Sequence, residues 1–168
     1  YMDFLASPAG RAREVQEMID TITTNKTDFF RDPKHFDFLV KTVLPDLLGM
    51  GTGRSSRRLA VWSAGCSSGE EAYTLAMVLS EFARNEANFR FSILAPDIST
   101  RILERAKKAV YTEECTEPIA ADLKKKYLLR SKNRDNPVVR ICPELRSRVL
   151  FKRINFMDED FGLDEPMD

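Results

Sequence analysis

A short apolar run that leads into a glycine-rich turn and then a helix is the feature that most constrains the fold of this chain. The run covers residues 59–62, the turn covers 63–71, and apolar positions then recur at helical spacing over 72–82. The same order begins again with a second apolar run at 89–95, followed by another helical pattern. A third run lies at 149–155. Strands that alternate with helices predict an α/β fold with a doubly wound, Rossmann-like parallel sheet.

The turn carries residue types that suit a ligand-binding loop. Gly65 and Gly69 allow a ligand to approach the backbone closely at the carboxyl end of a parallel strand. Their Gly-x-x-x-Gly spacing differs from the dinucleotide fingerprint, and the Gly-Lys-Ser/Thr of a phosphate loop is missing. Glu70 and Glu71 would repel a pyrophosphate but suit a cationic ligand such as a sulfonium or an amine. The alternative is that both acids only stabilise the first turn of the helix.

Asp97 lies just past the second predicted strand. An acid at this place in an open α/β sheet commonly accepts hydrogen bonds from ribose hydroxyls. The alternative is a simple cap for the next helix, which begins at Ser99 or Thr100 and has apolar positions from Ile102 to Val110. Together with the glycine turn, Asp97 favours a ligand that contains a nucleoside.

Two further helices are predicted ahead of the sheet. The Ser-Pro pair at 7–8 marks the start of the first, and apolar residues recur at helical spacing as far as Ile22. The Asp-Pro pair at 32–33 marks the start of the second, which has an apolar face over 36–44. Pro45 disfavours continuation of that helix, because proline lacks the amide hydrogen and clashes with the preceding turn.

The second half of the chain contains a dense basic segment. Residues 101–153 carry 15 basic and 7 acidic side chains, whereas 154–168 carry 6 acidic side chains and no basic one. Two β-like runs at 126–130 and 138–142 predict an antiparallel hairpin within the basic segment. The basic side chains suit an acidic partner, and the alternative is a solvated helix face and hairpin.

These elements divide the chain into three parts. We expect a small N-terminal helical domain over 1–48, a polar, glycine-rich linker over 49–58, and an incomplete α/β domain over 59–168. An antiparallel β-subdomain over 122–148 would be inserted into the last of these.

Composition and single residues exclude several classes of protein. Among the 168 residues no apolar run approaches the roughly 20 residues of a membrane span, and residues 1–10 lack the pattern of a signal peptide. Cys66, Cys115 and Cys142 form no Cys-x-x-Cys pair, so we expect free buried thiols in a reducing cytosol rather than a zinc site. His35 is the only histidine and is expected to face solvent, which disfavours a histidine base or a polyhistidine metal site.

The segment at 24–32 (Thr-Asn-Lys-Thr-Asp-Phe-Phe-Arg-Asp) is richer in polar and aromatic residues than a two-helix appendage needs. Together with 61–71 (Val-Trp-Ser-Ala-Gly-Cys-Ser-Ser-Gly-Glu-Glu) and 95–99 (Ala-Pro-Asp-Ile-Ser), it resembles the CheR-type chemotaxis receptor glutamate methyltransferases. The predicted hairpin matches the small β-subdomain that those enzymes insert in the sheet, and 149–158 resembles the strand and asparagine that follow it. The resemblance spans residues 11–160, and its first two motifs together are highly specific.

The resemblance implies a protein-glutamate O-methyltransferase that adapts chemotactic signalling. Such an enzyme moves a methyl group from S-adenosylmethionine to receptor glutamates, leaves S-adenosylhomocysteine and uses no metal. Its partner would be the cytoplasmic domain of membrane chemotaxis receptors, with neither nucleic acid nor membrane insertion involved. The location would be cytoplasmic.

The resemblance also implies a set of site residues: Asn25, Thr27, Arg31, Glu71, Asp97, Asn155 and Phe156. The first three would reach from the helical unit into the cofactor pocket. Arg31 would lie nearest the transferring methyl and is the candidate catalytic residue, although an ion pair with the adjacent Asp32 is the alternative. The two acids would hold the amino-acid and ribose portions of the cofactor, and the last pair would border the adenine.

The chain departs from the family's pattern at two places. Pro96 stands where the family usually has a small polar residue, and it removes a backbone donor beside Asp97. The family's next strand, with an Arg-Asn pair and a tyrosine, is not among residues 1–168, so we expect this segment alone to be inactive. The alternatives from other classes are a non-catalytic S-adenosylmethionine-binding or receptor-docking module and, less well supported by the glycine spacing, a nicotinamide-dependent oxidoreductase.

Overall fold

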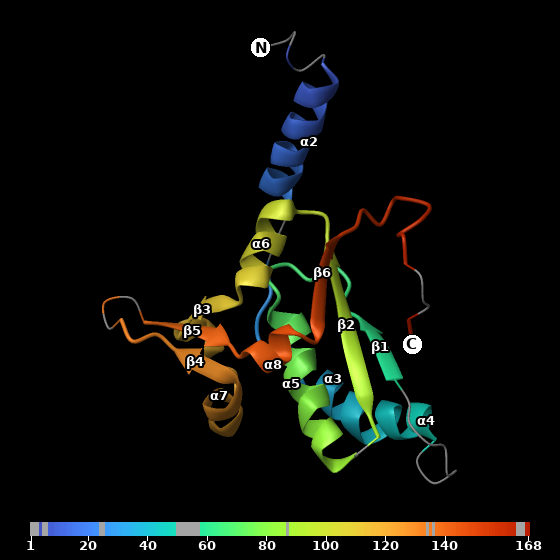
Figure 1. Ribbon diagram of the computed structural model, residues 1–168, viewed down its shortest axis with the longest axis vertical. Coiled ribbons are helices and arrows are strands. Elements are labelled where there is room, and N and C mark those ends of the chain that lie inside the picture. The colour runs from blue at the N-terminus through green and yellow to red at the C-terminus, as the bar shows by residue number, and fades with distance from the viewer. Residues whose placement is uncertain are drawn as a thin grey trace.

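The computed structural model describes residues 4, 7–23, 26–49, 58–86, 88–133, 135, 137–163 and 167–168. Its strands are β1 (Arg58–Trp62), β2 (Arg90–Asp97), β3 (Val110–Thr112), β4 (Leu128–Arg130), β5 (Val138–Ile141) and β6 (Val149–Arg153). Its helices are α2 (Pro8–Ile22), α3 (Pro33–Phe38), α4 (Leu44–Leu48), α5 (Glu70–Asn85), α6 (Thr100–Lys108), α7 (Ala121–Tyr127) and α8 (Pro143–Arg146), with a 3-10 turn at Glu114–Thr116. In Figure 1 the strands form two separate sheets, and α2 projects from the rest of the molecule.

The first sheet is parallel and has the strand order β1-β2-β6. In the central strand, Ile93 pairs with Val61 of β1 on one side and with Val149 of β6 on the other. Residues 93–97 of β2 are all buried, as expected for a parallel strand that is covered on both faces. The three predicted strands and the mixed α/β class are therefore confirmed.

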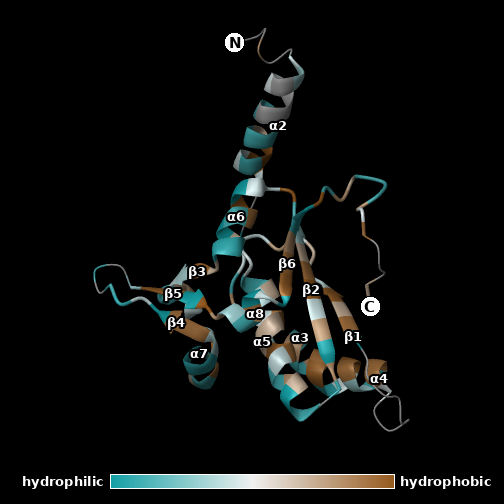
Figure 2. Ribbon diagram, viewed as in Figure 1, coloured by the Kyte–Doolittle hydropathy of each residue, from teal (hydrophilic) through white to brown (hydrophobic). Residues whose placement is uncertain are grey.

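Helix α5 packs along this sheet and supplies much of the core. Its buried apolar side chains recur at helical spacing and are Ala72, Tyr73, Ala76, Met77 and Leu79. Figure 2 shows hydrophobic residues along β1, β6 and α4, whereas α6 and α7 are mainly hydrophilic. The first turn of α5, which lies at the carboxyl end of β1, is therefore held in place by side chains buried in the core.

The second sheet is antiparallel and has the strand order β3-β5-β4. Leu129 of β4 lies opposite Arg140 of β5, which confirms the predicted hairpin pairing. Strand β3 contradicts the prediction that the preceding helix runs to Val110. Helix α6 ends at Lys108, Ala109 takes a left-handed φ of 55°, and Val110 pairs with Arg140. Cross-strand pairing of a β-branched residue thus outweighs its fit to the helical pattern.

The hairpin begins later than predicted. Lys126 belongs to α7 rather than to a strand, and it forms a salt bridge with Glu81 of α5. The hydroxyl of the buried Tyr127 donates a hydrogen bond to the same carboxylate. These contacts with α5 hold the segment in a helix, although its sequence alone resembles a strand.

The helix that begins at Pro33 continues past Pro45, contrary to the prediction. A π-helical turn over Leu39–Val43 joins α3 to α4 and places Pro45 at the second residue of α4. Leu44 is fully buried and Phe36 is half-buried, so the predicted apolar face does pack against the rest of the chain.

Helix α2 has the predicted spacing of apolar residues, but its apolar face is not covered by the described part of the chain. Val15, Met18 and Ile22 are 49%, 53% and 68% exposed. The helix meets α6 where Arg101 donates to the Asp20 carbonyl at 3.4 Å. Within the described ranges, no helix is both long and apolar enough to cross a membrane. The predicted linker falls almost wholly outside those ranges.

The cysteines and the histidine are placed mostly as predicted. Cys66 and Cys142 are free and buried, but Cys115 is exposed, contrary to the expectation of three buried thiols. His35 is exposed on α3. Among the residues that the structure describes, no group of three or more His, Cys, Asp or Glu side chains is arranged to hold a metal ion.

Candidate ligand-binding site

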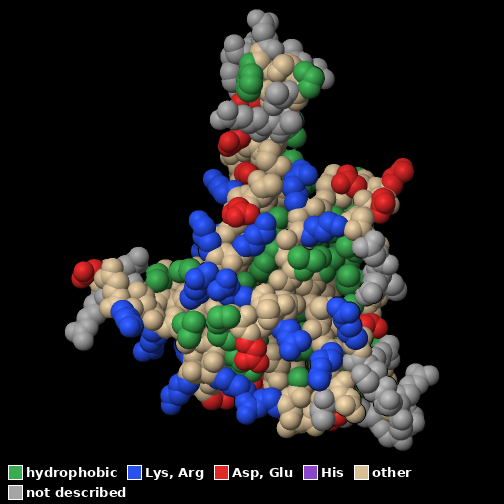
Figure 3. Space-filling model, in the orientation of Figure 1, with side chains coloured by type: hydrophobic (Ala, Val, Ile, Leu, Met, Phe, Trp, Pro, Cys, Tyr) green, Lys and Arg blue, Asp and Glu red, His purple; other side chains and the backbone are tan. Residues whose placement is uncertain are grey.

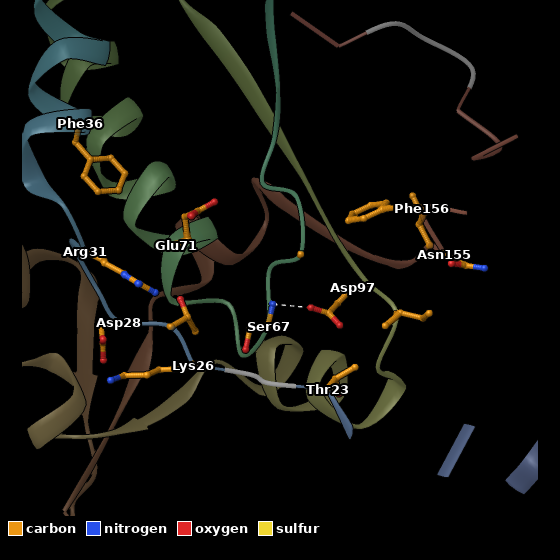
Figure 4. A pocket seen from close by; sticks show the side chains of 14 residues that line it. Thr23, Lys26, Asp28, Arg31, Phe36, Ser67, Glu71, Asp97, Asn155 and Phe156 are labelled. Atoms are coloured by element: carbon orange, nitrogen blue, oxygen red, sulfur yellow. Dashed lines mark hydrogen bonds between the residues drawn. The ribbon is translucent and has the colours of Figure 1, made fainter. Parts of the chain in front are cut away.

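A cavity of about 480 Å³ lies at the carboxyl ends of β1 and β2, the edge at which open α/β sheets bind ligands. Its lining side chains come from three places: the segment at 23–36, the turn after β1, and the ends of β2 and β6 (Figure 4). A concave site of this size suits a small molecule or cofactor.

Asp97 links two elements at the base of the cavity. It ends β2, is 8% exposed, and accepts the backbone N–H of Ser67 on Oδ2 at 2.8 Å (dashed in Figure 4). Its Oδ1 accepts the N–H of Ser99 at 3.0 Å, and Ser99 in turn caps α6 by accepting from Ile102 at 3.3 Å. Asp97 therefore steadies the start of α6 and also ties the turn after β1 to β2. Each carboxylate oxygen has a further lone pair for a ligand.

The turn after β1 leaves no room for side chains at its end. Gly69 has a φ of 95°, and a Cβ there would lie 3.1 Å from the Cβ of Ala106 and 3.2 Å from the hydroxyl of Tyr111. Gly65 and Ser67 are also left-handed, with φ values of 67° and 51°. The glycine at 69 is thus required both by the backbone conformation and by the close approach of its neighbours.

Pro96 does not interrupt β2. It pairs with Lys152 in the ladder between β2 and β6, and its carbonyl accepts the N–H of Cys66 at 2.9 Å. The thiol of Cys66 donates to the Ala95 carbonyl at 3.2 Å. Burial, followed by the charge of Asp97, raises the pKa of the Cys66 thiol to about 12. Cys66 is therefore a neutral packing group beside the cavity and not a nucleophile.

The two acids at the start of α5 have different surroundings. Glu71 lines the cavity, and its Oε1 accepts a hydrogen bond from the Ser63 hydroxyl at 2.7 Å. Glu70 is 4% exposed and accepts from the Ser68 hydroxyl at 2.6 Å, while burial raises the pKa of its carboxyl. Glu71 can present a negative charge to a ligand, whereas Glu70 holds the turn together.

Arg31 lies between two residues in the left-handed backbone region. Phe30 has a φ of 52° and Asp32 a φ of 53°, and such a conformation costs a non-glycine residue about 1–2 kcal/mol. The N–H of Phe30 donates to the hydroxyl of Thr74 on α5 at 3.1 Å, which helps to hold this segment. In Figure 4 the guanidinium points across the cavity toward the turn that carries Ser67. No salt bridge joins Arg31 to Asp32, two described residues, so the alternative of a local ion pair is not supported.

Asn155 and Phe156 follow β6 and lie across the cavity from Arg31 (Figure 4). The Phe156 ring packs near Trp62, with ring centroids 6.1 Å apart. The Asn155 amide donates to the carboxylate of Asp158 at 3.0 Å. This wall thus offers an exposed aromatic surface beside an amide that is held by its own turn.

Six of the seven predicted site residues line this one cavity: Thr27, Arg31, Glu71, Asp97, Asn155 and Phe156. Asn25 lies outside the described residues. The juxtaposition agrees with a shared site, and the ligand group that each residue contacts stays a prediction. Sequence reasoning missed Ser63 and Ser67, which act through a hydroxyl and a backbone N–H. The run of small polar residues in the turn was the available signal.

A second cavity, of about 440 Å³, adjoins the first and is likewise within the range of small-molecule sites. The two share Arg31, Phe36 and Glu71 as lining residues. The second extends along α3 past His35 to Leu39 in the π-helical turn. Arg31 therefore stands where a molecule in one cavity would meet a molecule in the other.

Comparison with known proteins identifies relatives of this chain. A protein named chemotaxis protein methyltransferase from Borreliella burgdorferi is 41% identical over 169 residues, which cover 100% of this chain and 58% of that protein. A probable chemotaxis protein methyltransferase from Rhizobium etli is 33% identical, covering 94% of the chain and 58% of that protein. The chemotaxis protein methyltransferase of Escherichia coli K12 is 32% identical, covering 100% and 55%. The chain thus spans a little over half the length of these relatives.

A protein family described as "CheR methyltransferase, SAM binding domain" matches residues 25–168. The matched region contains every described residue of the cavity except Thr23. The glycine turn, Asp97 and the Arg31 segment all fall within it. This chain therefore belongs to the CheR methyltransferase family.

Proposed function

We propose that this chain is part of a protein-glutamate O-methyltransferase, which transfers a methyl group from S-adenosylmethionine to glutamate side chains of chemotaxis receptors. One observation carries the proposal: a single cavity gathers Arg31, Glu71 and Asp97 at the carboxyl ends of β1 and β2. The names of the relatives, which are chemotaxis protein methyltransferases, support the assignment.

The lining of the cavity fits S-adenosylmethionine. Glu71 is a carboxylate that suits the ammonium group of the ligand's amino-acid portion, and Asp97 suits its ribose hydroxyls. Phe156 and Asn155 offer an aromatic face and an amide for the adenine. We also propose that Asn25, Thr27 and Arg31 close the pocket from the helical side. When bound, S-adenosylmethionine supplies a methyl group on a positively charged sulfur that is a good leaving group.

The residues of the chain have little acid–base work to do in this reaction. A glutamate side chain is already ionised near neutral pH, so no residue must remove a proton from it. The task of the protein is to hold the acceptor oxygen in line with the methyl group, which proximity and orientation can supply. Arg31 is the candidate for this role because its planar guanidinium binds a carboxylate through two parallel hydrogen bonds. Its place between the two cavities supports that assignment.

The division of the chain into domains belongs to the same proposal. We assign an N-terminal helical domain to 1–48, a linker to 49–58 and part of the methyltransferase domain to 59–168, with an inserted β-subdomain over 122–148. The antiparallel sheet β3-β5-β4 supports the inserted subdomain. Figure 3 shows Lys and Arg side chains over α6 and the small sheet, a surface that suits the acidic face of a cytoplasmic receptor domain. The location proposed for the protein is accordingly the cytoplasm.

Two measurements test the proposal in the full-length protein, meaning this chain within whatever longer polypeptide carries it. Calorimetry should detect binding of S-adenosylhomocysteine and no binding of NADH. Incubation with labelled S-adenosylmethionine and chemoreceptor membranes should then label the receptors. Mild alkali should release the label as methanol, because it hydrolyses methyl esters and leaves N-methyl groups intact.

The two measurements separate the competing functions. Binding without receptor labelling would indicate a non-catalytic S-adenosylmethionine-binding or receptor-docking module. Alkali-stable label would show methylation of a group other than a carboxylate. Absence of binding would contradict the cofactor assignment itself.

A further inference from the structure

We propose that Tyr111, on β3 of the small sheet, is a positioning residue that holds together the two chain segments bracketing the ligand cavity. The first segment is the turn at 65–71 and the second is the stretch at 27–31. The identity of the ligand rests on the proposed function. The placement of Tyr111 does not, because it follows from the contacts of this one side chain.

The hydroxyl of Tyr111 forms a hydrogen bond with the backbone of the turn. Tyr111 is 2% exposed, and its hydroxyl donates to the Ser68 carbonyl at 2.7 Å. The same oxygen would lie 3.2 Å from a Cβ on Gly69, so the hydroxyl is packed directly against the end of the turn. Burial raises the pKa of Tyr111 far above its usual range, so its hydroxyl remains a donor. Ser67, whose N–H donates to the Asp97 carboxylate, directly precedes Ser68 in the chain.

The ring of Tyr111 supports the second segment. It meets Phe29 edge to face, with ring centroids 5.0 Å apart and an interplanar angle of 79°. Phe29 is 1% exposed and lies between Thr27 and Arg31, both of which line the cavity. A shift of the Tyr111 ring would therefore move the residues that face the ligand from the helical side.

The small sheet supplies this side chain. Tyr111 pairs with Val139 of β5 in the antiparallel ladder, so its position follows that of the sheet. One buried tyrosine thus connects the small sheet to both walls of the cavity. Ligand binding and the conformation of β3 should then influence each other, because coupling between two sites is reciprocal.

Tyr73 offers a matched control. It is 1% exposed, its hydroxyl donates to the Ala106 carbonyl at 3.1 Å, and its ring lies 6.3 Å from that of Tyr111. A Tyr73→Phe variant loses the same kind of buried hydrogen bond in the same aromatic cluster. It leaves the bond to the glycine turn in place, so it reports the purely structural effect of a missing hydroxyl.

The experiment compares wild type, Tyr111→Phe and Tyr73→Phe in the full-length protein. S-adenosylhomocysteine affinity is measured by calorimetry and the midpoint of thermal unfolding by calorimetric scans. Tyr111→Phe should weaken S-adenosylhomocysteine binding by about 3- to 10-fold, the range expected for one hydrogen bond. Both variants should lower the midpoint of thermal unfolding by similar amounts, because each loses one buried hydrogen bond. Tyr73→Phe should nevertheless change the affinity for S-adenosylhomocysteine by less than about two-fold.

Hydrogen exchange provides a readout that a purely structural role would not move. In wild type and Tyr73→Phe, S-adenosylhomocysteine should slow amide exchange at 110–112 as well as in the turn. In Tyr111→Phe the slowing at 110–112 should disappear. Equal affinities for Tyr111→Phe and wild type, or equal losses in both variants, would overturn the inference. Failure of wild type to bind S-adenosylhomocysteine would contradict the proposed function instead.

Discussion

The carboxylate of Asp97 and the backbone N–H of Ser67 are joined by a hydrogen bond of 2.8 Å across the carboxyl ends of β2 and β1. Asp97 therefore lines the cavity and, through this bond, also holds the turn after β1 in place. A ligand that binds Asp97 would therefore stabilise the turn as well. The same bond complicates any substitution of Asp97, because two functions are removed together.

Asp97→Ala should weaken S-adenosylhomocysteine binding by at least about ten-fold, since a hydrogen bond to a charged group contributes about 1.5–3 kcal/mol. The loss of the bonds to Ser67 and Ser99 should also lower the unfolding midpoint. Calorimetry and thermal scans measure the two effects. Asp122→Ala, which removes an exposed acid from the start of α7, serves as the control. An unchanged affinity in Asp97→Ala would remove Asp97 from the ligand site.

Arg31→Ala should lower turnover by about 100-fold or more while it changes S-adenosylhomocysteine affinity far less, because misalignment of reacting groups mainly affects the chemical step. Arg31→Lys should recover little activity, because an ammonium lacks the planar fork of the guanidinium. Lys34→Ala, an exposed cation on α3, is the control. The measurement is the initial rate of receptor labelling at saturating S-adenosylmethionine. Equal losses of turnover and affinity would make Arg31 a cofactor ligand only.

The basic segment at 101–153, which includes Lys124 and Lys125 of α7, should give receptor association a strong salt dependence, because exposed charges are screened over about 8–10 Å near physiological ionic strength. Replacement of Lys124 and Lys125 by glutamate should slow association and leave S-adenosylhomocysteine binding unchanged. Lys126 is unsuitable for this test, since its salt bridge with Glu81 helps to dock α7 on α5. Stopped-flow or surface-binding kinetics at two salt concentrations provide the rates. An on-rate that is independent of salt would argue that these lysines are only solvated.

The thiols of this chain should differ sharply in reactivity. Cys115 is exposed and should be alkylated by iodoacetamide near pH 8, whereas Cys66 should remain unmodified in the native protein. Burial and the charge of Asp97 raise the pKa of Cys66 to about 12, so an increase from pH 7 to pH 9 should not accelerate the labelling of Cys66. Peptide mapping by mass spectrometry measures both rates. Fast native labelling of Cys66 would show that the turn opens readily.

The strands of the parallel sheet were predictable because each is a short apolar run bounded by turn residues. Pairing across the sheet then buries those runs, as at Ile93, so local pattern and tertiary packing agree. The gathering of Glu71 and Asp97 in one cavity was predictable for the same reason. The carboxyl ends of adjacent parallel strands meet at one edge.

Other features depend on contacts that no local pattern contains. Strand β3 exists because Val110 finds a partner in Arg140, some thirty positions later in the sequence. Lys126 is helical because Glu81 lies beside it in space. Glu70 and Glu71 differ because packing buries the first and leaves the second exposed, and two adjacent glutamates look alike in a sequence. The role of Pro45 depends on the π-helical turn before it.

The left-handed backbone at Phe30 and Asp32 has a consequence for how Arg31 meets its ligand. A guanidinium on a relaxed loop would sample many positions and lose that freedom on binding, which weakens affinity. Here a left-handed residue stands immediately before and after the arginine. Folding therefore already restricts the position and direction of the Cα–Cβ bond of Arg31. Replacement of the exposed Asp32 by glycine would relieve the strained φ at that position, yet would widen the range of positions open to Arg31. Relief of backbone strain and preorganisation of the arginine are therefore opposed at Asp32.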